Sequence, residues 1–304
     1  MNTSPRVSII IPTYNHANFL REALQSIQAQ SLSDWEAIVV NNYSEDDTIS
    51  IVESFRDPRI RLVNFRNNGV IAASRNKGIG LSRGEYLAFL DSDDIWFPEK
   101  LAKCLQHFTD DIKLVGHGFS LLGPKRRNIF SGPENRATFA SLLYEGNCIT
   151  PSATVVRRDA VISVGGFSES RDVITAEDYH LWLKLAQAGN KMFFLKDVLA
   201  GYRIHSGNQS SSVDKHLCAL LSVLNEFFPK SDGLNLKIRS QIRRRYAIAF
   251  YGAGRSYQQS GAYLSSLPLL FRSIQTWPFF LKSYMAIVFA LVGAMVRKQP
   301  RSRS

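Results

Sequence analysis

The sequence predicts an α/β protein with a doubly wound, mostly parallel β-sheet and a helical region at its C-terminal end. Short apolar runs, which suit strands buried on both faces, alternate with helical patterns over the first third of the chain. This alternation is typical of a parallel sheet. Beyond Val213 the pattern is helical. The chain has 304 residues, of which 45% are hydrophobic, enough for one large core or for a core and a smaller domain.

In the N-terminal third, each apolar run leads into a polar loop and then into a helix. The first helix is predicted because apolar residues from Phe19 to Ile27 recur at helical spacing. Ser44 and Asp47 resemble a capping box before the second helix, with an acid in place of the usual Glu. The predicted strands are residues 7–11, 35–40, 60–63 and 86–90, and the predicted helices are residues 18–30, 48–56, 70–82 and a segment starting near Pro98.

The middle of the chain has a less regular pattern. Residues 114–119 and 153–156 are predicted strands, and Gly165-Gly166-Phe167 is a predicted turn. A helix is predicted over residues 176–188, and it opens with Glu177-Asp178, two acids well placed against the positive end of the helix dipole. Residues 206–212 form a polar loop.

Three acids, Asp91, Asp93 and Asp94, directly follow the buried strand 86–90. Ligands of an open α/β sheet bind beyond the carboxyl ends of its strands, and a divalent cation would relieve the repulsion between these carboxylates. Asp91-Ser92-Asp93 therefore stands where a metal and a phosphate would bind. The alternative is a solvated turn in which Asp94 caps a helix.

The charge is unevenly distributed. Residues 213–304 hold 14 Lys and Arg against 3 Asp and Glu, a net charge of +11, so residues 1–212 are neutral overall. Membrane phospholipid and nucleic acid are the two obvious anionic partners for such a region. Three scattered cysteines without metal or disulfide spacing indicate a reducing compartment, and the N-terminus lacks an apolar core long enough for a secretion signal.

Six motifs recur in order over about the first 212 residues and together resemble the inverting family-two glycosyltransferases of GT-A fold. The resemblance implies a catalytic domain at residues 1–212 and a basic helical region at residues 213–304. It also implies a hexosyltransferase type of enzyme, active in the synthesis of lipopolysaccharide, capsule or exopolysaccharide. The motifs are VSIIIPTYN at Val7, Ser-x-Asp-Asp-Thr at Ser44, SRNKGIGLSRGEYLAFLDSDD at Ser74, GGF at Gly165, AEDYHLWLKLA at Ala176 and YRIHSGNQSS at Tyr202.

The resemblance also implies roles for individual residues. Asp91 and Asp93 match the D-x-D pair, which holds Mn²⁺ or Mg²⁺ against the diphosphate of a nucleotide-sugar donor. Asp178 matches the catalytic base, which takes the proton of the acceptor hydroxyl. His205 matches a histidine that completes the metal site or contacts the diphosphate. Residues implied at the donor are Pro12, Thr13, Tyr14, Asn42, Arg75, Asp91, Ser92 and Arg203.

Two of these assignments have plain structural alternatives. Glu177-Asp178 would also serve as helix-capping acids, and Arg75 would also serve as a surface cation on a helix. The family pattern Asp-Asp-Gly-Ser is replaced here by Asn41-Asn42-Tyr43-Ser44. An amide at Asn42 still accepts a hydrogen bond from a base, so a UDP-sugar stays the favoured donor.

Two other functions remain open from the residues alone. One is a catalytically inactive protein that binds a membrane or nucleic acid, and the other is a sugar nucleotidyltransferase. Pro12-Thr13-Tyr14-Asn15 stands where a nucleotidyltransferase would carry a Gly-rich loop with an Arg. Nucleic acid is disfavoured as a partner, because the C-terminal aromatics lie in apolar helices and are not interleaved with charge as a stacking platform.

The C-terminal region is predicted to dock the enzyme on the cytoplasmic face of the cell membrane as a peripheral protein. The run from Phe279 to Val296 is borderline in length for a spanning helix, and Trp277, Phe280 and Tyr284 suit a membrane interface. Docking would bring Asp178 to a saccharide acceptor carried by a lipid. The alternative is that this run packs as an ordinary helix against the catalytic domain.

Overall fold

The structure, a computed structural model, describes residues 4–123, 127–204, 212–230 and 233–298. It contains two compact units. The first comprises Met1–Leu142 with Asn147–Asn208, and the second comprises Leu143–Gly146 with Gln209–Ser304. The assignment of residues 1–212 as a catalytic domain stays a prediction.

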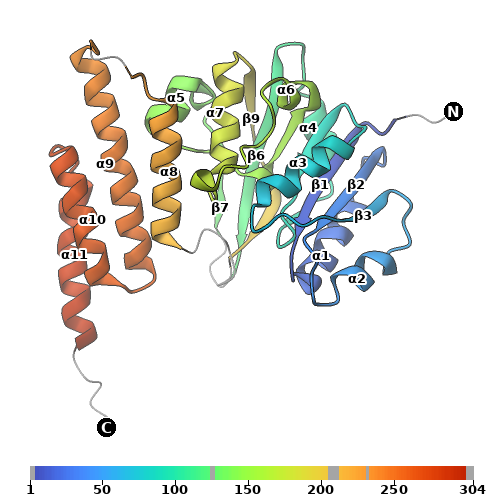
Figure 1. The fold of residues 1–304 in the computed structure, drawn as a ribbon, viewed down its shortest axis with the longest axis horizontal. Helices are drawn as coiled ribbons and strands as arrows, with labels where there is room; N and C mark the ends of the chain where they lie inside the picture. Colours follow the sequence, from blue (N-terminus) through green and yellow to red (C-terminus); the bar gives the residue numbers. More distant parts are fainter. Residues whose placement is uncertain (1–3, 124–126, 205–211, 231–232, 299–304) are drawn as a thin grey trace, which may run out of the picture. The chain divides into compact units, whose positions relative to one another are not determined.

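The first unit is built on one mixed sheet with the strand order β3-β2-β1-β4-β8-β6-β9-β5, and β7 pairs with β6 (Figure 1). Strands β1 to β4 are parallel to one another, as predicted, whereas β8 runs antiparallel to both β4 and β6. The strands are β1 (Val7–Thr13), β2 (Trp35–Asn41), β3 (Ile60–Asn64), β4 (Tyr86–Phe89), β5 (Ile95–Trp96), β6 (Ile112–Leu122), β7 (Asn128–Ile129), β8 (Thr154–Arg157) and β9 (Lys191–Arg203).

Helices cover both faces of the sheet, as side-chain alternation along β1 indicates. Val7, Ile9 and Ile11 belong to the same buried cluster as the apolar faces of α1 and α4. Ile10 points the other way and meets α3 so closely that a Cβ at Gly78 would lie 2.6 Å from its Cγ2. The helices of this unit are α1 (Ala17–Gln28), α2 (Thr48–Ser54), α3 (Ile71–Leu81), α4 (Lys100–Leu105), α5 (Phe139–Glu145, which continues into the second unit), α6 (Arg158–Ser163) and α7 (Glu177–Gln187).

The topology places a switch point at the carboxyl ends of β1 and β4. The chain moves outward from β1 to β2 and β3 and then returns to β4 on the other side of β1, so the direction of winding reverses between β1 and β4. Ligands of open α/β sheets bind at such a switch point. Thr13 ends β1, and the acidic turn that begins at Asp91 follows β4, so both lie at this edge.

Three strands and one cap differ from the sequence-based expectations. The short β5 and the long β9 pair with each other, and β5, β7 and β9 were all unpredicted. Strands β5 and β7 have only two residues each, and the apolar pattern of β9 is interrupted by Lys196 and Asp197. The capping box was wrong: the Ser44 hydroxyl donates to Asn41 Oδ1 at 2.6 Å and does not cap α2. Asp46 accepts the Thr48 N–H at 3.1 Å.

The second unit is helical, as predicted, and consists of α8 (Val213–Phe227), α9 (Leu236–Gln259), α10 (Tyr263–Thr276) and α11 (Leu281–Lys298). Buried polar contacts join α9, α10 and α11. The hydroxyls of Ser273 and Ser283 lie 2.8 Å apart, and Gln258 Nε2 donates to the Ala286 carbonyl at 2.7 Å. No helix in the described part of the chain is long and apolar enough to cross a membrane.

Candidate active site

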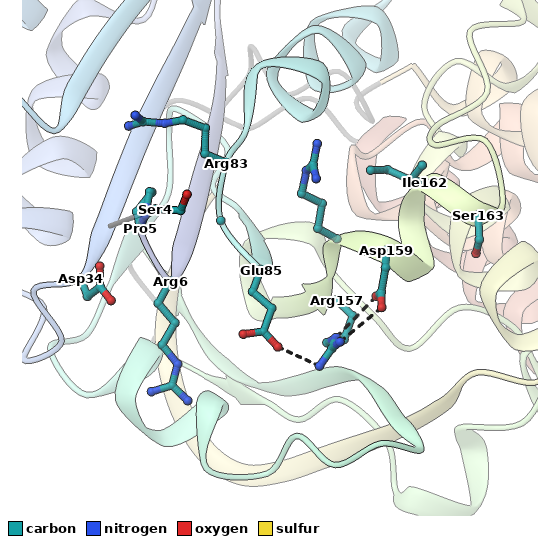
Figure 2. Close-up of a pocket in the computed structure, with 12 residues that line it drawn as sticks. Ser4, Pro5, Arg6, Asp34, Arg83, Glu85, Arg157, Asp159, Ile162 and Ser163 are labelled. Atoms are coloured by element: carbon teal, nitrogen blue, oxygen red, sulfur yellow. Dashed lines mark hydrogen bonds and ion pairs between the residues drawn. The ribbon is translucent and has the colours of Figure 1, made fainter. Parts of the chain in front are cut away.

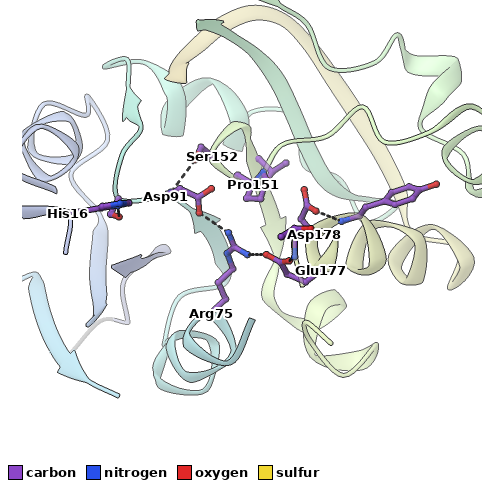
Figure 3. A network of polar contacts seen from close by, with 11 residues as sticks. His16, Arg75, Asp91, Pro151, Ser152, Glu177 and Asp178 are labelled. Atoms are coloured by element: carbon purple, nitrogen blue, oxygen red, sulfur yellow. Dashed lines mark hydrogen bonds and ion pairs between the residues drawn. The ribbon is translucent and has the colours of Figure 1, made fainter. Parts of the chain in front are cut away.

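A buried arginine joins three separate elements at the carboxyl edge of the sheet. Arg75 lies on α3 and is 3% exposed. Its Nη1 donates to Glu177 Oε1 at 2.7 Å, and its Nη2 donates to Asp91 Oδ1 at 2.8 Å (Figure 3). Burial lowers the pKa of Arg75, but the two carboxylates outweigh burial and raise it above its usual value. The alternative of a surface cation is therefore wrong, and Arg75 ties the end of β4 to the start of α7.

Glu177 was considered from the sequence only as a helix-capping acid, but it lies in the candidate site. It is buried, and its second oxygen, Oε2, accepts the Thr175 N–H at 2.8 Å. Both carboxylate oxygens are therefore occupied, one by Arg75 and one by the backbone that leads into α7. The sequence signal was present, since Glu177 is the first acid of the Glu-Asp pair.

Asp178 is the acid next to this buried pair, and it keeps part of its surface open. Its Oδ1 accepts the Tyr179 N–H at 2.7 Å, and its Oδ2 accepts a long hydrogen bond from Asn147 Nδ2 at 3.4 Å. Burial, followed by the charge of Glu177, raises the pKa of Asp178 to about 7. A carboxylate with a pKa near neutrality can accept a proton from a hydroxyl and hold it.

The acidic turn after β4 is held by neighbouring side chains. The Asp91 N–H donates to Ser152 Oγ at 3.1 Å, and Ser92 Oγ shares a hydrogen bond with His16 Nδ1 at 2.9 Å. Asp94 is buried, and burial, followed by the charges of Asp91 and Asp93, raises its pKa well above the usual range. Asp94 also does not cap α4, whose N-cap is Glu99. The turn thus divides into a buried acid and the partly exposed pair Asp91 and Asp93.

Arg203 links the end of β9 to this turn. Its backbone N–H donates to Asp94 Oδ1 at 3.0 Å, and its Nε donates to the Asp93 carbonyl at 3.1 Å. Its Nη2 donates to Glu22 Oε2 on α1 at 2.6 Å. Arg203 therefore lies beside the acidic turn, while its role at the donor stays a prediction. His205 lies outside the described residues.

The oxygen ligands at this turn fit a hard cation that is held partly by the protein and partly by a substrate. Among residues 4–123, 127–204, 212–230 and 233–298, no group of three or more His, Cys, Asp or Glu is placed to hold a metal. Asp91 and Asp93 supply carboxylate oxygens at the switch point. Mg²⁺ is usually bound through one or two carboxylates together with substrate phosphates. These two acids therefore suit a cation shared with a diphosphate.

The predicted donor loops also meet at this edge. Pro12 and Thr13 are buried at the end of β1, and Thr13 Oγ1 has no hydrogen-bond partner in the described part of the chain. Tyr14 is half exposed. Asn42 donates its N–H to the Thr13 carbonyl at 3.0 Å, and its Oδ1 accepts the Asn67 N–H at 2.9 Å. The backbone of Asn67 therefore occupies one of the two lone pairs of the amide oxygen that was expected to accept from a base.

A separate cavity of about 780 Å³ lies at the opposite edge of the sheet, near the amino ends of β1 and β4 (Figure 2). Arg6, Arg83 and Arg157 line it, and Arg157 pairs with Glu85 at 2.8 Å. It contains none of the predicted site residues. The acid-lined switch point, and not this cavity, is the candidate active site.

Comparisons with known proteins find one matching family model and similar bacterial proteins. Residues 8–165 match the family described as Glycosyl transferase family 2. The chain is 31% identical over 221 residues to the putative teichuronic acid biosynthesis glycosyltransferase TuaG of Bacillus subtilis, covering 69% of this chain and 84% of that protein. It is 30% identical over 250 residues to the UDP-Glc:alpha-D-GlcNAc-diphosphoundecaprenol beta-1,3-glucosyltransferase WfaP of Escherichia coli, covering 80% of this chain and 92% of WfaP.

A solved structure shares the fold across the chain. The mannosyltransferase PcManGT of Pyrobaculum calidifontis, determined with GDP-Man and Mn²⁺, superposes with a TM-score of 0.61 at 18% identity. The superposition covers 99% of this chain and 89% of the mannosyltransferase chain. The predicted GT-A architecture is confirmed at the level of the fold.

Proposed function

This chain belongs to glycosyl transferase family 2 and is a glycosyltransferase with relatives in bacterial polysaccharide synthesis, and on that premise we propose a metal-dependent, inverting transfer reaction. The donor is a nucleotide-diphosphate sugar, with a UDP-sugar favoured, and the acceptor is a saccharide hydroxyl. One observation carries the proposal. A buried Arg75 connects Asp91 at the end of β4 to the first turn of α7, where Asp178 has a pKa raised to about 7.

Asp178 acts as the general base in this proposal. The acceptor oxygen attacks the anomeric carbon of the donor sugar, and its proton passes to the Asp178 carboxylate. The bond from the anomeric carbon to the diphosphate oxygen breaks as the new glycosidic bond forms, so the nucleotide diphosphate leaves with the electron pair. A single displacement of this kind inverts the anomeric configuration.

The other residues hold the donor and position the base. Asp91 and Asp93 would hold Mn²⁺ or Mg²⁺, which neutralises charge on the departing diphosphate. Arg75 and Glu177 fix the start of α7 and thereby orient Asp178. Thr13, whose buried Oγ1 is available at the end of β1, Tyr14 and Arg203 contact the donor. PcManGT, determined with GDP-Man and Mn²⁺, supports a divalent cation for this fold.

We further propose that the acceptor is carried by a lipid and that the enzyme works on the inner face of the cell membrane. The support is the name of WfaP, which specifies a diphosphoundecaprenol-linked acceptor, together with the net charge of +11 over residues 213–304. A basic region concentrates a peripheral enzyme at an anionic membrane surface, where such acceptors reside.

A donor screen tests the proposal directly. UDP-, dTDP- and GDP-sugars are compared by thermal shift with and without Mn²⁺, because a ligand that binds the native state raises the unfolding midpoint. The best donor is then assayed for sugar transfer and for the anomeric configuration of the product. A retained configuration, or donor binding that ignores the metal, would contradict the proposed reaction.

Asp93→Ala is expected to remove the metal-dependent part of donor binding. The variant keeps the turn, since the backbone carbonyl of Asp93 still accepts from Arg203 Nε, but it loses one of the two carboxylates proposed to hold the cation. Calorimetry with UDP and Mn²⁺ should show affinity reduced by at least about tenfold, or about 1.4 kcal/mol. Unchanged affinity in a folded variant would rule out this residue as a ligand.

The pH dependence of the reaction should report Asp178. Its pKa is raised to about 7, chiefly by burial, so below that pH the carboxyl is protonated and cannot accept the acceptor proton. We expect kcat/KM to fall about tenfold per pH unit below pH 7 and to level off above it. Donor affinity measured over the same pH range is the control. A flat rate profile between about pH 5.5 and 8 would argue against Asp178 as the base.

A further inference from the structure

We infer that one face of α11 is a docking surface for an anionic lipid membrane, and we call it the α11 outer face. It consists of the exposed large apolar side chains of this helix. They are Leu281, Tyr284, Met285, Val288, Phe289, Leu291, Val292 and Met295. This face would mediate the membrane association proposed above. Only its link to a lipid-carried acceptor rests on that proposed function.

Helix α11 carries its large apolar side chains on its exposed side, which is the reverse of an ordinary surface helix in a globular protein. The residues that pack inward are small: Ser283 and Ala290 are fully buried, Ala286 is nearly so, and a Cβ at Gly293 would lie 2.7 Å from the Tyr263 ring. The large apolar residues point outward, and Val288 and Met295 are 62% and 68% exposed. Surface helices normally bury their large apolar side chains. A contiguous exposed set of this kind marks an interaction site.

The exposed residues form a continuous stripe. Leu281, Met285, Val288, Val292 and Met295 are spaced alternately by four and three residues, so they lie on one side of the helix along nearly its whole length. At 1.5 Å per residue the stripe is about 21 Å long. A stripe of this geometry fits a partner helix or a membrane interface, and its shape alone does not distinguish them.

Charge distinguishes the two occupants. Residues 281–298 contain no acid, and the exposed Lys282 lies at the start of the stripe. The Arg255 guanidinium lies 5.3 Å from the centroid of the Phe289 ring. The sequence RKQPRSRS, residues 297–304, adds four cations, of which Arg297 and Lys298 are the last two residues of the helix. A second copy would bring two regions of +11 charge together, whereas anionic lipid attracts each nearby Lys and Arg.

The stripe is expected to lie in the plane of the interface. No helix in the described part of the chain can span a membrane. A helix with one apolar face, flanked by cations, inserts that face at the boundary between headgroups and acyl chains. Phe279, 76% exposed just before α11, extends the apolar surface toward the helix start.

Vesicle flotation of the full chain tests the inference without any sugar donor. Vesicles of phosphatidylcholine alone are compared with vesicles that also contain phosphatidylglycerol, at low and high salt. We expect binding to the anionic vesicles, weakened by salt. The double variant Val288→Ser/Val292→Ser changes no charge and removes two exposed apolar side chains. It should bind at least tenfold more weakly while its circular dichroism and melting temperature stay the same.

The matched control is Leu236→Ser, which also replaces a highly exposed apolar residue of the second unit, at the start of α9, and should leave binding unchanged. The inference fails if the full chain ignores anionic vesicles at low salt or if the double variant binds as well as the wild type. It also fails if light scattering shows a dimer that the double variant dissociates, because the face then belongs to a second copy. Vesicle binding without sugar transfer would instead refute the proposed function and leave the docking surface standing.

Discussion

Asp178→Asn is expected to lower kcat by about 10²- to 10⁴-fold and to leave donor affinity unchanged. The amide has nearly the shape of the carboxylate, and its oxygen can still accept the Tyr179 N–H, so the first turn of α7 is preserved. It cannot take the acceptor proton. Single-turnover kinetics, together with calorimetry of the donor with Mn²⁺, would separate the chemical step from binding.

Asp159→Asn is the matched control for this variant. Asp159 also stands in the first turn of a helix, α6, and its Oδ1 accepts the N–H of the following residue at 2.7 Å. It lies at the cavity on the opposite edge of the sheet, so its loss should leave the rate unchanged. If Asp178→Asn keeps more than about a tenth of the wild-type turnover, the loss is far below that expected for a general base, and the role lies elsewhere.

The parallel half of the sheet could be read from the sequence because its strands are apolar on both faces. The runs that begin at Val7, Trp35 and Tyr86 proved to be β1, β2 and β4, with boundaries within two residues. The run at Ile60, which proved to be β3, is partly exposed but was still found. Strand β9 was missed because it is only half-buried over much of its length and carries charged residues. The alternation that marks an ordinary strand is therefore weak there.

The candidate site was predictable in its acids and less so in its contacts. Asp91 and Asp93 follow from their place at the end of a buried strand. Asp178 was assigned by its match to a family motif, because an acid in the first turn of a helix by itself favours a capping role. The burial of Arg75 does not follow from sequence, because its partners Asp91 and Glu177 are 16 and 102 residues away. The use of the Asn42 amide oxygen by the Asn67 backbone is likewise a tertiary contact. The sequence thus pointed to these acids, whose roles stay predictions, while the contacts that hold them in place required the fold.

Arg75→Met should be the most destabilising single change at the site. Methionine approximates the length of the arginine side chain but leaves the carboxylates of Asp91 and Glu177 facing each other without the cation between them. Removing one partner of a buried ion pair costs about 3–5 kcal/mol. Because Asp91 is partly exposed, we expect a loss of about 3 kcal/mol in the free energy of unfolding, measured with urea at pH 8.

Arg157→Met is the matched control, and it shows how much of the stability loss depends on the burial of the ion pairs. Arg157 also pairs with two carboxylates, Glu85 and Asp159, but both of these are more than half exposed. Its loss should change the free energy of unfolding by less than about 1 kcal/mol. Equal effects of the two substitutions would mean that Arg75 does not stabilise the first unit through its ion pairs with Asp91 and Glu177.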